Sequence, residues 1–199
     1  MNCMLAILGV LCSELSVLVK MNIEKHIENI IKVVDPDARG LQHTPARVAR
    51  SYDEFFSGYA HNPEDEICAL YGSEMNEMVV LKNIPFESNC EHHLLPMIGT
   101  VSVGYIPSGK IIGASKLARI VDCFAHRMQL QERFTMEVAG AVNSILRPNG
   151  VAVCVRAEHF CISHRGVKKH GTSFVTKYFV GEIKDNYDLR REFLLETHG

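Results

Sequence analysis

The sequence predicts an α+β protein with an antiparallel sheet and a pair of helices, preceded by an N-terminal helical arm. Segments rich in β-branched and apolar residues fall into two groups, within 78–106 and 151–183. Two segments with helical periodicity separate them, between residues 115 and 146. Strand pairs on either side of a helix pair favour an antiparallel sheet with its helices grouped together. A chain of 199 residues is long enough for one sizeable core.

Within the arm, apolar residues recur at helical spacing over 22–34, which predicts an amphipathic helix. Thr44 and Pro45 are typical of an N-cap and the first helical position, so a second helix should begin there and end at Gly58. Residues 62–65 could open a short third helix. In the remaining chain we expect strands over 78–86 and 98–106, a helix capped by Ser115, a helix over 131–146, and strands over 151–157 and 174–183.

Charge and composition exclude several functional classes. Hydrophobic content of 47% and charged content of 22% are ordinary for a globular protein. The net charge of -2 gives no global electrostatic case for binding nucleic acid or an anionic membrane. An anionic ligand must therefore be held by local cations.

The seven cysteines are an odd, irregularly spaced set, which argues against a disulfide framework. A reducing cytoplasm suits thiolate ligands better, so we expect a cytoplasmic protein.

The first nineteen residues are apolar with one charge, Glu14, and are about long enough to span a bilayer. They lack a basic start and a clear small-residue cleavage site. We therefore expect an extra packed helix or an over-extended start, and no membrane partner.

Two distant segments each place a thiol beside an imidazole. Cys90 and His93 are three residues apart, and Cys161 follows much later with His159 nearby. Three good ligands from two segments, with a position left open, is the pattern of a catalytic zinc rather than of a closed structural site. We therefore predict one Zn²⁺ held by Cys90, His93 and Cys161, with His92 and His159 poised beside it. The alternative is that these are buried thiols and core histidines.

Five sequence blocks resemble the GTP cyclohydrolase I family. They follow one another in family order: TPARVAR at 44–50, CEHHLLP at 90–96, GASKLARI at 113–120, QLQER at 129–133 and EHFCISHRGV at 158–167. The resemblance covers roughly residues 22–183, which makes it more specific than any single motif. His126 and the pair Lys177–Tyr178 depart from the usual pattern, and His126 and His164 match no family role.

The resemblance implies the tunnelling fold, a four-stranded antiparallel sheet with two helices in the order ββααββ. Five subunits of this family close a barrel, and two rings stack into a decamer with active sites between subunits. Ring closure would remove the exposed sheet edges, which otherwise favour uncontrolled association. On this basis residues 1–21 are an apolar leader of uncertain role, 22–76 the helical arm, and 77–199 the catalytic domain.

The family activity implies that GTP and water become 7,8-dihydroneopterin triphosphate and formate, the first step of tetrahydrofolate and pterin biosynthesis. The resemblance makes Cys90, His93 and Cys161 the zinc ligands. It makes His159 the group that protonates N7 of guanine and His92 the group for later proton transfers, because histidine titrates near neutral pH. Support of the metal is the alternative role for both.

The resemblance also implies a set of substrate-binding residues. Gln131 and Glu132 would recognise the guanine edge, although acidic side chains are also favoured at any helix start. The triphosphate would be held by Ser115, Lys116, Arg119 and Arg165, with Arg50 contributed by a neighbouring subunit. Lys116 and Arg119 share a helix face, and such charges can also simply be solvated.

Two other functions remain open from the sequence. One is a purine- or pterin-binding paralogue of the same fold that has lost turnover. The other is a related enzyme whose product is rerouted, for example to 7-deazaguanine synthesis.

Overall fold

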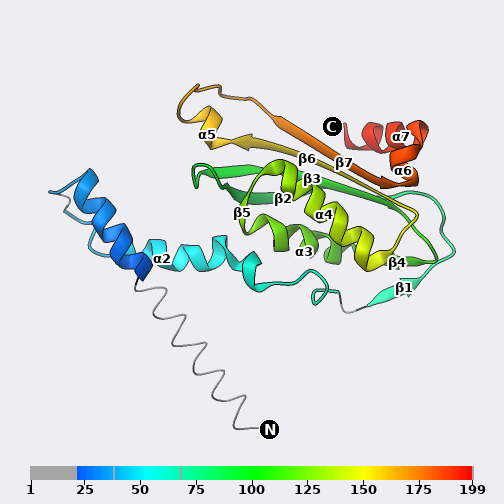
Figure 1. Cartoon of the computed structure of the whole chain (residues 1–199), viewed down its shortest axis with the longest axis horizontal. Helices are drawn as coiled ribbons and strands as arrows, with labels where there is room; N and C mark the ends of the chain where they lie inside the picture. Colours follow the sequence, from blue (N-terminus) through cyan, green and yellow to red (C-terminus); the bar gives the residue numbers. More distant parts are fainter. Residues whose placement is uncertain (1–21, 38, 68, 199) are drawn as a thin grey trace, which may run out of the picture. The chain divides into compact units, whose positions relative to one another are not determined.

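The computed structural model describes residues 22–37, 39–67 and 69–198 (Figure 1). The chain forms two compact units, with the boundary between Glu54 and Phe55. Residues 55–76, which the sequence analysis grouped with the arm, thus belong to the larger unit. The expected leader, residues 1–21, lies outside the described residues.

The smaller unit contains the first predicted helix and all but the last residue of the second. Residues 22–34 are helical, and α2 spans Thr44–Phe55. The prediction of a third helix at 62–65 is wrong. After a 3-10 helix at Ser57–Ala60, the chain makes two separate turns, in which Asp65 N donates to Asn62 O (3.0 Å) and Ile67 N to Glu64 O (3.3 Å). These four-residue turns, each closed by an i+3 to i hydrogen bond, do not build the i to i−4 ladder of an α-helix.

The larger unit is built on a sheet with the strand order β5-β2-β3-β6-β7. The predicted ββααββ order is confirmed, with neighbouring long strands antiparallel and a short parallel strand, β5, added at one edge. The strands are β2 (Val79–Cys90), β3 (Pro96–Ile106), β5 (Met128–Gln129), β6 (Gly150–His159) and β7 (Phe174–Gly181). A separate two-stranded sheet pairs β1 (Leu70–Gly72) with β4 (Lys110–Ile112).

Several strand ends differ from the prediction. The first strand was expected over 78–86, but β2 continues to Cys90, which is its last residue. The last strand ends at Gly181, whose positive φ of 60° turns the chain into α6 (Glu182–Asp185). A further helix that we did not expect, α7 (Tyr187–Thr197), begins after Asn186. The Asn186 side chain caps this helix by accepting from the Asp188 and Leu189 N–H groups.

Helices cover both faces of the sheet (Figure 1). The helices α3 (Ala114–Ala125) and α4 (Gln131–Leu146) pack on one face, where Phe86 meets Phe134 with ring centroids 4.9 Å apart. The helices α6 and α7 cover part of the other face, through Ile183 and Phe193. The alternation along β6 fits this arrangement, because Val151, Val153 and Val155 join the first core cluster, and Ala152 and Cys154 the second.

Ser115 lies inside the first turn of α3, so Gly113, and not Ser115, is the N-cap.

The register of β3 fixes which residues share one end of the sheet. Met97 pairs with Ser88 on β2 and with His159 on β6. Because β3 is antiparallel to both neighbours, β2 and β6 run in the same direction and finish at the same end of the sheet, on either side of β3. The residues that follow this row, Cys90 and Cys161, therefore lie at the same end of the sheet.

None of the helices within the described ranges is both long and apolar enough to span a bilayer.

We expect Gly99→Ala to destabilise the sheet strongly. A Cβ at Gly99 would lie 1.9 Å from Arg156 O and 2.7 Å from Ala157 Cα, both backbone atoms of β6. The strands would have to separate, at a cost of about 1–3 kcal/mol or more. Gly140→Ala is the control, because its Cβ meets nothing within 4 Å and alanine stabilises a helix interior by about 0.5–1 kcal/mol. If urea denaturation gives Gly99→Ala the same free energy of unfolding as the wild type, this packing is contradicted.

Candidate metal centre and surrounding site

The structure brings together the three side chains predicted to bind a metal. One ligand atom from each of Cys90, His93 and Cys161 lies within 4.8 Å of the others, and Cys90 Sγ is 4.0 Å from His93 Nδ1. Within the part of the chain that the structure describes, this is the one such group of three or more. Tetrahedral zinc with thiolate and imidazole ligands requires separations of roughly 3.5–3.8 Å. Small side-chain movements would thus close these residues around one ion, and their donor atoms suit zinc.

A tight turn after β2 places two of these ligands. The His93 and Leu94 N–H groups both donate to Cys90 O, at 3.3 and 2.8 Å, and Cys90 N donates to Leu95 O at 2.9 Å. Leu94 adopts a left-handed conformation, with φ of 55°. The turn is anchored to α4 because Arg133 Nη2 donates to Glu91 Oε2 at 2.6 Å. This turn brings His93 back toward Cys90.

The third ligand comes from the short helix α5 (Phe160–Ser163), which follows β6 directly. Burial and then the neighbouring Cys90 thiol raise the pKa of Cys161. The thiol is therefore protonated at neutral pH unless a metal displaces the proton.

His159 is held beside the cluster by Gln131. His159 Nε2 lies 2.8 Å from Gln131 Oε1, and both side chains are buried. Gln131 Nε2 faces three acceptors, Val155 O (3.2 Å), Phe174 O (3.0 Å) and Thr176 Oγ1 (3.1 Å). The amide nitrogen must point toward these oxygens, which leaves its carbonyl oxygen for the imidazole.

This network assigns the tautomer of His159. Since Gln131 Oε1 only accepts, His159 Nε2 carries the proton and Nδ1 is the acceptor. Burial lowers the pKa of His159, and the Glu132 carboxylate opposes this shift. The ring is thus neutral at neutral pH, with Nδ1 as the nitrogen that can exchange a proton.

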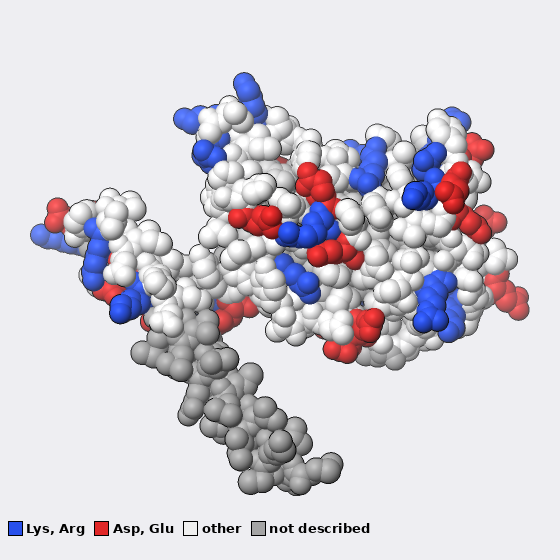
Figure 2. Space-filling view, in the orientation of Figure 1, with Lys and Arg blue, Asp and Glu red and all other residues white. Residues whose placement is uncertain are grey.

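The other predicted residues at this end are solvent-accessible. His92 is exposed, and its ring meets the His93 ring edge-on with centroids 6.2 Å apart. Arg165 Nη1 lies 3.0 Å from His93 Nε2, so this arginine reaches the metal cluster itself. Glu132 is exposed in the first turn of α4. The loop after α5 also carries exposed Lys168 and Lys169, and basic residues gather over this loop at the upper left of Figure 2.

The residues predicted to bind the triphosphate are not all close to the Cys90, His93 and Cys161 cluster. The helix α3 starts just after β4, at the end of the sheet away from Cys90, so Ser115 and Lys116 lie at that far end. A helix of 12 residues is about 18 Å long, which separates them from the metal ligands. Arg50 lies exposed on α2, in the smaller unit.

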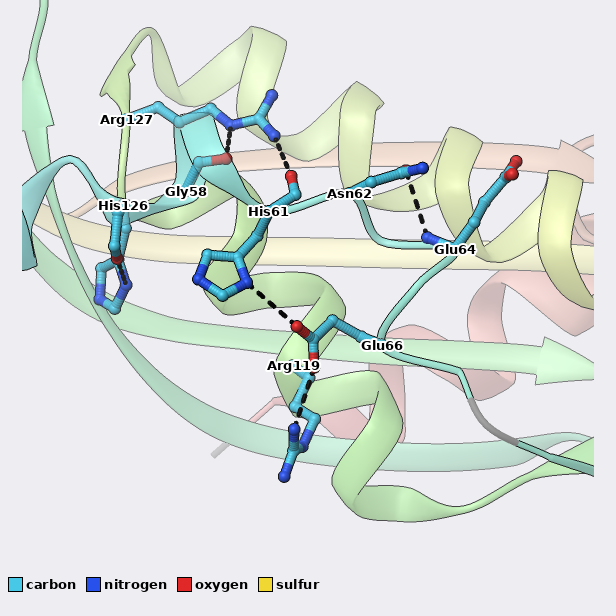
Figure 3. Close-up of polar contacts among 9 residues, drawn as sticks. Gly58, His61, Asn62, Glu64, Glu66, Arg119, His126 and Arg127 are labelled. Carbon is cyan, nitrogen blue, oxygen red and sulfur yellow. Dashed lines mark hydrogen bonds and ion pairs between the residues drawn. The ribbon is translucent and has the colours of Figure 1, made fainter. Parts of the chain in front are cut away.

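Arg119 borders a separate hollow of about 400 Å³ on the outer side of α3. Its Nη1 donates to Glu66 Oε2 at 2.9 Å, and His61 Nδ1 lies 3.1 Å from Glu66 Oε1 (Figure 3). The hollow is lined by Ser57, Gly58, His61, Glu66, Arg119, Asp122, Cys123 and His126.

Sequence reasoning missed the supporting partners of these side chains. Gln131 was predicted to face the guanine, but its side chain points to His159 and the sheet. Glu66 and His61 were not singled out at all. Neither residue has a sequence signal, because the bond between Glu66 and Arg119 spans 53 positions. His126 and His164, which match no family role, contact Ser57 and Phe160 respectively.

Comparison with known proteins adds an independent line of evidence. A sequence model of the GTP cyclohydrolase I family matches residues 23–198. Proteins named GTP cyclohydrolase 1 from Brucella suis and Brucella abortus are each 43% identical over 162 residues, covering 80% of this chain and 76% of theirs. The same figures hold for the protein of that name from Brucella canis.

A solved structure of the archaeosine synthase QueF-Like in its apo form also matches, over 52% of this chain and 93% of its own, with 24% identity and a TM-score of 0.44. The match of the family model to residues 23–198, together with the Brucella relatives, shows that this chain belongs to the GTP cyclohydrolase I family.

Proposed function

We propose that the protein is a zinc-dependent GTP cyclohydrolase I, which converts GTP and water to 7,8-dihydroneopterin triphosphate and formate. The observation that carries this proposal is the convergence of Cys90, His93 and Cys161 beside a buried, oriented His159. The family relationship supports the same reaction. The product would enter tetrahydrofolate and pterin synthesis in the cytoplasm.

The roles follow from the chemistry of the site. Zinc held by Cys90, His93 and Cys161 would supply Lewis-acid activation of water. His159 transfers a proton through Nδ1, because Gln131 holds its Nε2 proton. A neutral imidazole first takes up a proton and then delivers it to the purine, which fits a group that moves protons in both directions. His92 is exposed next to the cluster and serves the later proton transfers.

Guanine recognition falls to Glu132. A carboxylate can accept from both the N1–H and the amino group of guanine, and adenine does not offer this pair. Glu132 is exposed and follows Gln131, whose side chain contacts His159. Glu132 is therefore at the same end of α4 as His159. The Gln131 amide hydrogens face oxygens of the protein, so we assign its side chain to support of His159.

The triphosphate requires cations that one subunit does not gather at one place. Arg165 lies at the metal cluster, whereas Ser115, Lys116 and Arg119 lie along α3. We propose that a neighbouring copy supplies the α3 residues and that another contributes Arg50, within a decamer of two stacked pentamers. The open edge strand β7 supports ring assembly, because its Phe174, Val175 and Tyr178 side chains are 37–40% exposed in the single chain.

Metal analysis should find about one zinc per chain in protein purified without chelators. Cys161→Ser removes one of the three ligands and should release most of the metal. Cys154→Ala removes another buried thiol, one beneath α6 and α7, and should leave the zinc content unchanged. Because metal binding must displace the Cys161 proton, zinc affinity in a chelator competition should rise with pH. Equal loss of zinc in both variants would contradict the assigned ligands.

Incubation with GTP should release formate and yield a pterin that fluoresces after oxidation. His159→Ala should lower kcat by about 10²–10⁴-fold without lowering the zinc content. His164→Ala is the matched control, because this exposed imidazole stacks on Phe160 outside the proposed machinery. Turnover that survives His159→Ala at full rate would refute the assigned role.

Glu132→Ala should weaken use of GTP by about 10- to 100-fold in kcat/KM, since hydrogen bonds to a charged group are lost. ATP should not replace GTP in the wild type, and the zinc content of the variant should be normal. If Glu132→Ala retains wild-type kcat/KM, another group reads the guanine edge.

A further inference from the structure

The hollow beside α3 contains an arginine that is held by a fixed carboxylate. Glu66 is bound from two sides, by Arg119 Nη1 at 2.9 Å and by His61 Nδ1 at 3.1 Å. Its side chain is 20% exposed, whereas that of Arg119 is 58% exposed. The Arg119 hydrogen bond, followed by that of His61, lowers the pKa of Glu66, so the carboxylate stays ionised at neutral pH. A more enclosed anion therefore orients a more exposed cation.

The geometry leaves the guanidinium available for a second anion. The bond to Glu66 runs through Nη1. A guanidinium has five N–H donors in a rigid fork, so Nε and Nη2 can still bind phosphate oxygens. An arginine with this exposure otherwise samples many rotamers, and fixing it on binding costs conformational entropy. A carboxylate that fixes the fork beforehand removes part of this cost.

We propose that Glu66, itself held by His61, is a positioning residue that orients Arg119 for the triphosphate of the substrate. The inference rests on the proposed function, in which Arg119 binds this triphosphate. Figure 3 shows Glu66 between His61 and Arg119, while the Glu64 carboxylate, two residues earlier, points away from them. Repulsion between Glu66 and the phosphates is screened by solvent at this exposed surface and is offset by the arginine between them.

The test compares Glu66→Ala with Glu66→Gln. Alanine removes the acceptor for Arg119, so the KM for GTP should rise about two- to tenfold with kcat unchanged. Glutamine can still accept from Arg119 and donate to His61, so its KM should stay near that of the wild type. Glu64→Ala removes the same charge from the same loop without touching Arg119 and should leave the KM unchanged. In an Arg119→Ala background, Glu66→Ala should have no further effect.

Binding of inorganic triphosphate, measured by calorimetry, tests the same coupling without turnover. Glu66→Ala should weaken this binding two- to tenfold, and only when Arg119 is present. An unchanged or lower KM in Glu66→Ala, with thermal stability intact, would overturn the inference while formate release upheld the proposed function. Absence of formate together with Arg119-dependent triphosphate binding would overturn the proposed function and leave the positioning role standing.

Discussion

The pairing of β3 with β2 and β6 is the constraint on which the site depends. Met97 pairs with both Ser88 and His159, so two segments about 70 residues apart in sequence reach the same end of the sheet. Cys90 ends β2, and Cys161 lies one residue into α5 after β6. A slip of one residue would turn the side chains of a strand to the opposite face. The apolar alternation of β6, which fills cores on both faces, resists that slip.

The polar groups around the metal ligands connect the site to this core. The buried side chain of Gln131 joins His159 to β7 through Phe174 O and Thr176, and Thr135 Oγ1 lies 2.6 Å from Thr176 Oγ1. The His159 imidazole is therefore oriented by a network that joins α4, the sheet and its edge strand β7. The residues that we propose to bind the triphosphate are distributed differently, because Ser115, Lys116 and Arg119 lie along α3 while Arg165 lies beside His93. The three candidate metal ligands meet within one chain, whereas the proposed phosphate residues do not, and this difference is the reason for proposing that neighbouring copies complete the site.

Much of this structure could be predicted from local sequence patterns. The boundaries of α4 at 131 and 146 follow from its apolar stripe, and the grouping of Cys90, His93 and Cys161 follows from the paired thiol and imidazole motifs. The short strands β1, β4 and β5 could not be predicted, because two or three residues carry no periodicity and form only through their partners. Helix α7 was missed although Asn186 signals its start. The partners of Gln131, Arg119 and Glu91 depend on long-range contacts, so no local spacing reveals them.

The central claim is that one chain binds one metal ion through two sulfurs and one imidazole. X-ray absorption at the zinc edge of the purified protein measures this coordination directly. The account predicts two sulfur ligands at about 2.3 Å and two nitrogen or oxygen ligands at about 2.0–2.1 Å. A fully sulfur-ligated ion, or one without sulfur ligands, would contradict it.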